Sequence, residues 1–432
     1  MFIRQIRIFN VRAIRHLDWS IPRGSERGWH VVIGDNGSGK STFLRSVALA
    51  LVGPSEAAAL RQDWDDWLAR GKDSGIIRLD VSYDRSLDKF SGAGPVIRKT
   101  LLPVPLTFSR TNGNVELKKV KLTANRHVWG SGVGWFSAAY GPFRRFAGGD
   151  KDYEKIFYSN PKLAPHLSVF GENVALTECV RWLQDLQFKK LESHPEGDLL
   201  DCIREFVNQP GFLPHQAYLD RISSDGVQFM DGNGCLLSVE ELSDGYRSVL
   251  SMTFELIRQL SRTYDIKNIF SADDRTKITA PGVVLIDEVD AHLHPSWQRK
   301  IGVWLREHFP NIQFIVTTHS PLICQAATVG SVWRLPRPGT EEKGGMVTGT
   351  DLDRLLYGNV LDAYSTEMFG EDIARSDESK KLLEHLAELN RKELNQGLTE
   401  SEIREQSELR AALPTAAHDL STPPEKEHAA AE

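Results

Sequence analysis

One segment of this 432-residue chain has the residue types and spacing of a phosphate-binding loop. Residues 34–41 read Gly-Asp-Asn-Gly-Ser-Gly-Lys-Ser, which matches the pattern G-x-x-x-x-G-K-[ST]. The glycines allow backbone N–H groups to converge on phosphate oxygens, and the helix that follows adds the positive end of its dipole. We expect Lys40 to reach the β- and γ-phosphates of a nucleotide and Ser41 to bind Mg²⁺.

A pair of carboxylates follows a short apolar segment later in the chain. Residues 283–286 are Val-Val-Leu-Ile, and Asp287 and Glu288 come directly after them. At the end of a strand, Asp287 can bind Mg²⁺ through water, and Glu288 can orient or deprotonate a water that attacks a phosphate. A strand that simply ends in acidic residues is the alternative, which the phosphate-binding loop disfavours. The two features predict an ATPase, in which ATP and water give ADP and phosphate.

A histidine follows a second apolar segment. His319 lies three residues after the run Phe314–Val316, so we expect it at the same edge of the sheet, in reach of the γ-phosphate. A histidine after a strand is also commonly structural, and His319 therefore counts only in combination with the other residues.

The surrounding pattern indicates the elements that must position these residues. Apolar runs predict central parallel strands at 29–33, 283–286 and 314–316, with a helix at 41–52 after the phosphate-binding loop. A helix at 296–308 between the last two strands completes a βαβ unit. The remaining predictions are strands at 3–9, 18–21, 76–83, 115–122 and 134–140, helices at 174–191, 199–207 and 244–262, and a hairpin turn within 229–237.

Composition excludes several classes of protein. The chain is 41% hydrophobic and 25% charged, which is average for a globular protein. Its longest apolar run, Val47–Val52, is too short to span a bilayer, and residues 1–21 lack the apolar core of a secretory signal. We therefore expect a cytoplasmic protein with no membrane partner. Its four cysteines are far apart, and we expect them to be small buried hydrophobic residues.

The order of the motifs resembles that of ABC-type ATPases, specifically the RecF/SMC-like ATPases. The sequence LSDGYRS at 242–248 and the loop around Asp290 lie between the phosphate-binding loop and His319 as in that superfamily. The resemblance covers roughly residues 1–52, 130–145 and 226–335. It implies an α/β P-loop NTPase of ABC-ATPase type. The apolar patterns themselves indicate a mixed central sheet and a helical lobe. A C-terminal helical hairpin is indicated by leucines at 382, 383, 386 and 389 and by a capping box of Thr399 and Glu402.

In that family the segment at 242–248 is the signature motif, which caps the γ-phosphate of ATP held by a partner subunit. The resemblance implies this role for Ser243 and Gly245, whereas Asp244 stands where a second glycine is usual and Tyr246 where Gln or Glu is usual. One phosphate-binding loop and one signature per chain imply a head-to-tail homodimer around two nucleotides, or a higher oligomer built from it.

The expected site therefore has three groups of residues. Glu288 and His319 are the expected catalytic residues, and Ser41 and Asp287 are the expected metal ligands. The expected ATP-binding residues are Gly34, Asn36, Gly37, Ser38, Gly39, Lys40, Ser41, Thr42, Ser243 and Gly245.

Residues 137–145 occupy the position of the family's Q-loop but contain no glutamine. Tyr140, Arg144 or a backbone group can serve instead. The alternative is a strand-to-loop turn with two solvated arginines, Arg144 and Arg145.

Three further segments resemble the compact bacterial ATPases of anti-phage modules, such as the Septu and retron-associated ATPases. They are YGPFR at 140–144, LSDGYRS at 242–248 and HLHP at 292–295. His292 and His294 are possible metal ligands, but without a completing residue we favour a loop at the dimer interface. A fused nuclease built on Asp351 and Asp353 is disfavoured, because the residues that follow predict helices and a tail.

We predict a homodimeric ATPase that senses nucleic acid or an invader's signal and controls a separately encoded effector, such as a nuclease, in a defence module. The alternatives are a RecF-like DNA repair or recombination ATPase and a nucleotide-gated scaffold with little hydrolysis. DNA is an expected partner, although no basic run locates a groove for it. The predicted segments are an N-terminal ATPase part (1–150), a helical lobe (151–225), a second ATPase part (226–350), a C-terminal helical segment (351–413) and a disordered tail (414–432). Within the C-terminal segment, a helical hairpin at 379–413 is a candidate docking element, and packing of this hairpin on the ATPase lobe is the alternative.

Overall fold

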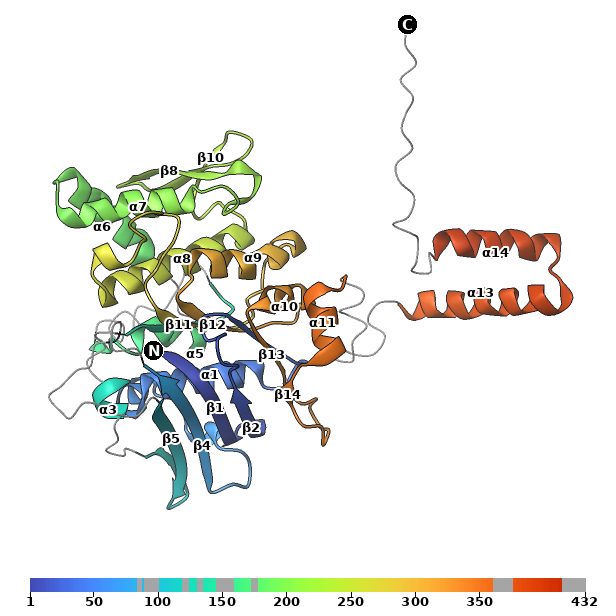
Figure 1. Cartoon of the computed structure of the whole chain (residues 1–432), viewed down its shortest axis with the longest axis horizontal. Coiled ribbons are helices and arrows are strands. Elements are labelled where there is room, and N and C mark those ends of the chain that lie inside the picture. The colour runs from blue at the N-terminus through green and yellow to red at the C-terminus, as the bar shows by residue number, and fades with distance from the viewer. Residues whose placement is uncertain are drawn as a thin grey trace, which may run out of the picture. The chain divides into compact units, whose positions relative to one another are not determined.

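The computed structural model describes residues 1–83, 88, 101–118, 124–129, 135–144, 159–171, 178–359 and 376–413 (Figure 1). The chain divides into two units, Met1–Phe369 and Gly370–Glu432. The first unit contains all the residues of the expected site, and the second contains a pair of helices. Each unit is described by itself.

A six-stranded sheet forms the centre of the first unit, in the order β14-β13-β3-β12-β11-β7. The strands from β13 to β7 run parallel to their neighbours, and β14 is antiparallel at one edge. Their carboxyl ends therefore lie at the same side of the sheet. The bounds are β3 (Trp29–Ile33), β7 (Ser137–Tyr140), β11 (Gly282–Ile286), β12 (Ile312–Thr317), β13 (Gly330–Arg334) and β14 (Gly345–Met346).

Both faces of this sheet are buried, because alternate residues of each strand belong to different hydrophobic cores. On β11, Val284 and Ile286 belong to one core, and Val283 and Leu285 to the other. Helices α8 and α9 cover the first face, and α1 lies on the second (Figure 1). The fully apolar strands are thus explained by burial on both sides. These helices are α1 (Lys40–Val52), α8 (Asp244–Thr263) and α9 (Pro295–His308).

A five-stranded antiparallel sheet, in the order β2-β1-β4-β5-β6, packs on the other side of α1. A buried glutamine joins the two sheets: the backbone N–H of Ile3 donates to Gln313 Oε1 at 2.7 Å, and Gln313 Nε2 donates to the carbonyl of Ile3 at 2.9 Å. The side chain thus pairs with β1 as a neighbouring strand would. The bounds are β1 (Phe2–Val11), β2 (Ile14–Ser20), β4 (Ser74–Ser82), β5 (Leu101–Thr111) and β6 (Asn114–Leu117).

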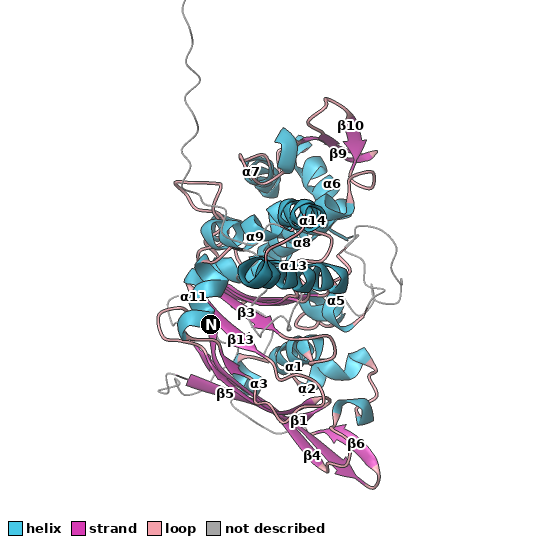
Figure 2. Cartoon of the chain, turned by 90° about the vertical axis from the view of Figure 1, so that its right-hand side faces the viewer, coloured by secondary structure: helices cyan, strands magenta, loops and turns pink. Residues whose placement is uncertain are grey.

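A helical lobe with a small antiparallel sheet, β10-β9-β8, lies beyond α8 and α9 (Figure 2). Helix α7 has a sharply amphipathic pattern, and its apolar residues join the same core as α8 and α9. The elements are α6 (Glu178–Leu191), α7 (Asp198–Val207), β8 (Tyr218–Ser223), β9 (Gly226–Met230) and β10 (Leu236–Ser238). The shorter helices are α2 (Pro54–Ala57), α3 (Ala124–His127), α5 (Leu167–Phe170), α10 (Pro321–Cys324) and α11 (Gly349–Tyr357).

The second unit contains a helical hairpin of α13 (Asp377–Gln396) and α14 (Glu400–Ala412). Thr399 and Glu402 form the predicted capping box at the start of α14. The buried Gln406 donates to Asn390 Oδ1 at 2.9 Å and to Glu393 Oε2 at 2.7 Å, which fixes one helix against the other. The role of this hairpin stays a prediction, and residues 414–432 lie outside the described residues.

The predicted fold class is confirmed, with three local corrections. Strand β5 lies outside the expected strands, and it contains prolines at 103 and 105, which are unfavourable in a strand. Strand β8 begins within the segment predicted to be helical. Cys179 and Cys324 are buried as expected, but Cys202 is half-buried and Cys235 is exposed. In the described part of the chain, no single helix is long and apolar enough to cross a membrane.

The packing of α9 on the central sheet gives a testable prediction about Gly302. A Cβ at this position would lie 2.5 Å from Ala326 Cβ and 2.9 Å from the Trp29 ring. Glycine to alanine normally stabilises a helix by about 1 kcal/mol, but overpacking costs about 1–3 kcal/mol. We expect Gly302→Ala to lower the free energy of unfolding, measured by urea titration of tryptophan fluorescence. Gly345→Ala, whose Cβ would meet no atom within 4 Å, is the control, and equal midpoints for both variants would contradict this packing.

Candidate functional site

The phosphate-binding loop connects β3 to α1 at the carboxyl edge of the central sheet. Gly37 and Gly39 have φ values of 78° and 98°, in the left-handed region that favours glycine. Lys40 is 6% exposed, and its Nζ donates to the carbonyls of Gly34 at 2.7 Å and Asp35 at 3.0 Å. The lysine is therefore held inside the loop by the loop's own backbone.

The loop leaves polar groups available to a ligand. Ser38 Oγ is buried, and the described residues give it no hydrogen-bond partner. A Cβ at Gly34 would lie 2.6 Å from this oxygen, so the close approach requires glycine. Asn36 is exposed, and Ser41 and Thr42 are half-buried in the first turn of α1. The predicted ATP-binding residues of this loop thus surround one helix N-terminus, where an anion binds favourably.

The two carboxylates lie at the end of β11, beside the ends of β7 and β12. The Asp287 N–H donates to the Tyr140 carbonyl at 2.8 Å, and Thr317 Oγ1 donates to Asp287 Oδ1 at 2.6 Å. Within the described part of the chain, the buried Asp287 Oδ2 has no hydrogen-bond partner. An unsatisfied buried carboxylate oxygen normally costs free energy, and Mg²⁺ with its water ligands prefers such oxygens. Asp287, together with Ser41, therefore fits a magnesium site.

Glu288 has an unusual backbone conformation. Its φ is 46°, in the left-handed region that non-glycine residues seldom adopt. Its N–H donates to Thr317 Oγ1 at 2.8 Å, and the next residue, Val289, donates to the Thr317 carbonyl at 3.0 Å. One threonine therefore holds both acidic residues, and the strained backbone turns Glu288 away from the direction of the strand. Such strain is typical of functional sites.

Electrostatic coupling connects the three parts of the site. Burial lowers the pKa of Lys40, and this effect is opposed by the negative charges of Glu288 and Asp287. Partial burial, together with the Lys40 ammonium, lowers the pKa of His319 from its ordinary value. Because the folded-state pKa is lowered, the His319 imidazole is neutral near pH 7 and accepts a proton only under more acidic conditions.

Arg144, four residues after the end of β7, is buried and makes four hydrogen bonds. Its Nε donates to Ser248 Oγ at 2.9 Å, and its Nη1 to the carbonyls of Gly141 at 3.2 Å and Asp287 at 3.0 Å. Its Nη2 donates to the carbonyl of Glu288 at 3.1 Å. Burial lowers its pKa to about 10, opposed by the nearby carboxylates, so it stays charged at neutral pH. The alternative of a solvated turn is wrong for Arg144; Arg145 lies outside the described residues.

The expected signature segment forms the start of α8. Ser243 is the N-cap residue, and its exposed hydroxyl makes no capping hydrogen bond. A Cβ at Gly245 would lie 3.0 Å from the carbonyl oxygen of His292, so this glycine allows the helix to approach the loop after Glu288. The unusual Asp244 is exposed and forms an ion pair with Arg247, which offsets its negative charge at the helix start.

The other candidate residues do not form metal sites. His294 caps α9, accepting a hydrogen bond from the Ser296 N–H at 3.3 Å, and His292 is exposed with φ 66°. Asp351 and Asp353 are exposed on α11, and residues two apart on a helix point in different directions. The described residues contain no group of three or more His, Cys, Asp or Glu side chains placed to hold a metal.

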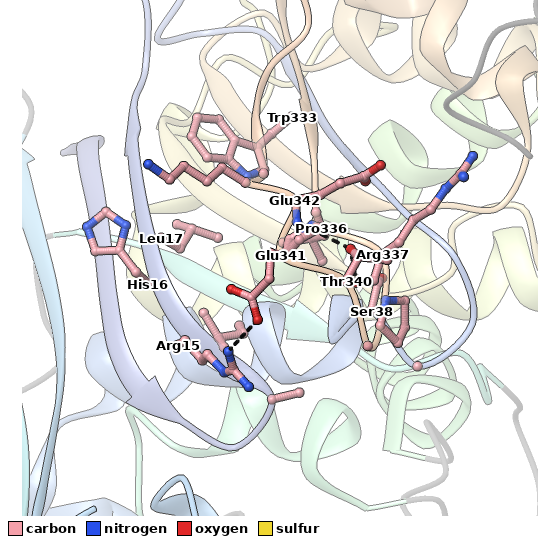
Figure 3. Close-up of a pocket in the computed structure, with 18 of the residues that line it drawn as sticks. Arg15, His16, Leu17, Ser38, Trp333, Pro336, Arg337, Thr340, Glu341 and Glu342 are labelled. Atoms are coloured by element: carbon pink, nitrogen blue, oxygen red, sulfur yellow. Dashed lines mark hydrogen bonds and ion pairs between the residues drawn. The ribbon is translucent and has the colours of Figure 1, made fainter.

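A cavity of about 570 Å³ adjoins the phosphate-binding loop (Figure 3). Its walls come from the β1–β2 turn, from Gly37 and Ser38, and from residues 333–344 around the β13–β14 turn. Two of its lining residues, Arg15 and Glu341, form an ion pair at 3.7 Å, and a third, Arg337, pairs with Asp35 of the phosphate-binding loop at 3.6 Å.

A family model described as "AAA domain, putative AbiEii toxin, Type IV TA system" matches residues 168–325. The chain is 38% identical over 386 residues to the "Retron Vc95 probable ATPase" of Vibrio cholerae serotype O1 biovar El Tor, covering 76% of this chain and 72% of that protein. The chain belongs to this family of retron ATPases. The sequence-based resemblance to retron and Septu ATPases is thereby confirmed, and as a member of this ATPase family the chain has a nucleotide-binding fold.

Two other relatives of the chain differ from it in length. The chain is 26% identical to the Septu protein PtuA of Bacillus mycoides (strain KBAB4), covering 84% of this chain but 45% of that protein. It is 33% identical to the "Retron Ec83 probable ATPase" of Escherichia coli, covering 42% of this chain and 33% of that protein. The chain thus spans less than half the length of these two relatives.

Solved structures with a similar arrangement include an SMC head domain from Thermotoga maritima, with a TM-score of 0.40, 13% identity and coverage of 81% of this chain and 99% of that chain. A structure of the recombination mediator protein RecF with ATP has a TM-score of 0.42, 12% identity and coverage of 80% and 99%.

Two residues that hold the site were not identified from the sequence. The Thr317 hydroxyl donates to the Asp287 carboxylate and accepts from the Glu288 backbone N–H, and Ser248 receives the Arg144 hydrogen bond. Thr317 directly follows the apolar run Phe314–Val316, but this position alone does not reveal its hydrogen-bond partners. No sequence signal identifies Ser248, because its partner comes from a loop that is 104 residues away along the chain.

The hydroxyl of Thr317 gives a prediction about stability. Thr317→Val removes the donor to Asp287 and the acceptor of the Glu288 N–H, which leaves two buried polar groups unsatisfied. We expect the free energy of unfolding to fall by about 1–3 kcal/mol, measured by urea titration. Thr317→Ser keeps the hydroxyl and should lose much less. A loss in Thr317→Ser that equals or exceeds the loss in Thr317→Val would contradict a leading role for the hydroxyl.

Proposed function

We propose that this chain is an ATPase that hydrolyses ATP at the carboxyl edge of its central sheet. The observation that carries the proposal is the convergence there of Lys40, the Asp287–Glu288 pair and His319 from three neighbouring parallel strands. The charges of Glu288 and Asp287 oppose the lowering of the Lys40 pKa, and the Lys40 ammonium lowers the pKa of His319, which supports a shared site. The family relationship to probable retron ATPases supports the same activity.

Each residue has a proposed role. The backbone N–H groups of the loop and the start of α1 bind the phosphates, and Lys40 leaves its two carbonyls to contact the β- and γ-phosphates. Mg²⁺ held through Ser41 and Asp287 would neutralise phosphate charge. Glu288 accepts a proton from water as the water oxygen bonds to the γ-phosphorus and the bond to ADP breaks. His319, neutral at pH 7, donates a hydrogen bond to a γ-phosphate oxygen.

The proposed active form is a head-to-tail homodimer. The exposed Ser243 hydroxyl and the α8 N-terminus suit recognition of a phosphate held by a second copy, because both present donors to solvent. ATP then lies between two chains and stabilises their association, and hydrolysis releases it, which is a shift in population that the nucleotide controls.

The proposed biological setting is a cytoplasmic defence module. The relatives named for Septu and retron systems support this setting, and the ATPase would respond to nucleic acid or another invader signal and control a separately encoded effector. A nuclease is the effector we propose. Double-stranded DNA is the first stimulus to test.

The ATPase activity is tested by phosphate release from Mg²⁺-ATP. We expect turnover by the parent protein, a loss of nucleotide binding in Lys40→Ala, and retained binding with a fall in turnover of at least about 100-fold in Glu288→Gln. Phosphate release is measured with and without double-stranded DNA, and nucleotide binding by equilibrium dialysis. Equal turnover by Glu288→Gln and the parent would rule out the proposed role of Glu288.

Dimer formation is tested in the Glu288→Gln protein, in which ATP persists. Sedimentation velocity should show a monomer without nucleotide and a dimer with Mg²⁺-ATP. Ser243→Arg, which blocks the exposed start of α8 without touching the nucleotide loop, should bind ATP and remain monomeric. A dimer that forms equally in Ser243→Arg would show that the signature segment does not engage the partner's nucleotide.

A nucleotide-gated scaffold remains a second candidate, because the exposed Asp244 adds a negative charge where the partner's phosphate would lie. The same two assays separate the candidates. A scaffold forms the ATP-dependent dimer without releasing phosphate, whereas the proposed ATPase does both.

A further inference from the structure

The buried Arg144 side chain joins two parts of the chain that have different proposed tasks. One end of its guanidinium binds Ser248, in the second turn of α8. The other end binds the carbonyls of Asp287 and Glu288, at the end of β11. Arg144 is 5% exposed and Ser248 is 2% exposed, so this connection is excluded from solvent.

The two ends of this connection face different nucleotides in the proposed dimer. Glu288 belongs to the chain's own site, with Lys40 from the same chain. The start of α8, with Ser243, would face the nucleotide that the second copy holds. A rigid connection between α8 and the Glu288 backbone is therefore a connection between two ATP sites.

The geometry favours transmission of small movements. The guanidinium is planar, and its donors have fixed directions, so it cannot follow a shift of α8 without changing its bonds to the acidic loop. Glu288 is already held at φ 46°, a conformation that persists only while its surroundings fix it. The carbonyls of Asp287 and Glu288 are part of those surroundings, and both accept hydrogen bonds from Arg144.

A second contact lies beside the first. Gly245 approaches the carbonyl of His292, where an added Cβ would have only 3.0 Å. The start of α8 is thus packed directly against the loop that follows Glu288. A movement of this helix therefore displaces both this loop and the Arg144 side chain.

We propose that Arg144 is a positioning residue that couples the signature helix to Glu288, so that ATP bound at one site of the dimer promotes hydrolysis at the other. The inference rests on the proposed ATPase function. The two sites of the proposed homodimer are identical, so each gains from ATP bound at the other. Hydrolysis as a function of ATP concentration is therefore sigmoidal.

The experiment measures the rate of phosphate release over a wide range of ATP concentrations. The parent should give a Hill coefficient above 1, with 2 as the upper limit for two sites. Ser248→Ala removes only the Arg144 bond to α8, and it should bring the Hill coefficient to about 1 and lower kcat by about tenfold. Its affinity for ATP at the isolated site, measured in the monomeric Ser243→Arg background, should stay within about twofold of the parent value.

Ser251→Ala is the matched control. Ser251 is also buried in α8, but its hydroxyl donates to the backbone carbonyl of Ser248 at 3.2 Å, rather than bonding the Ser248 hydroxyl or the Arg144 guanidinium. We expect this variant to keep both the Hill coefficient and kcat. Equal behaviour of Ser248→Ala and Ser251→Ala would overturn the inference, because a purely structural hydroxyl predicts that result.

Arg144→Lys provides an independent test if Ser248→Ala does not fold, as judged by circular dichroism. Lysine keeps the charge but cannot bridge Ser248 and two carbonyls at once, so cooperativity should be lost here too. Retained cooperativity in this variant, or a parent with hyperbolic kinetics, would overturn the coupling while leaving the ATPase intact. A parent that releases no phosphate under any condition would instead contradict the proposed function itself.

Discussion

The parallel register of β7, β11, β12 and β3 is the constraint on which the rest of the structure depends. Because these strands run in the same direction, four loops that are far apart in the sequence begin at one edge of one sheet. Backbone hydrogen bonds, such as that from Asp287 to Tyr140, continue the register beyond the strands. The positions of Lys40, Glu288 and His319 are therefore set mainly by backbone pairing.

Burial on both faces makes this register difficult to change. Val283 and Leu285 pack toward α1, while Val284 and Ile286 pack toward α8 and α9. A shift of β11 by one residue would exchange the two sets and bring Asp287 into an apolar core. The two hydrophobic cores thus fix the position of the polar residues that follow β11.

Much of this arrangement could be predicted from the sequence, because the decisive patterns are local. The apolar run that becomes β3 and the helix after it have nearly the predicted bounds, and the glycine and lysine spacing identifies the loop between them. The connections made by Thr317, Gln313 and Arg144 could not be predicted in this way. Each depends on a side chain that meets a distant backbone group, and hydrophobic periodicity contains no information about such pairs. The prolines of β5 and the strand β8 show the same limit, since tertiary pairing overrides local preference there.

The position of Lys40 has a consequence for how a nucleotide enters. Its ammonium already donates hydrogen bonds to the carbonyls of Gly34 and Asp35. An incoming phosphate therefore has to replace these two hydrogen bonds. The net gain from the lysine is the difference between two sets of hydrogen bonds, and it is largest for a ligand that offers oxygens to replace both carbonyls. In the proposed site, the resting loop would thereby discriminate among anions, because a ligand with too few well-placed oxygens would leave the lysine bound to its two carbonyls.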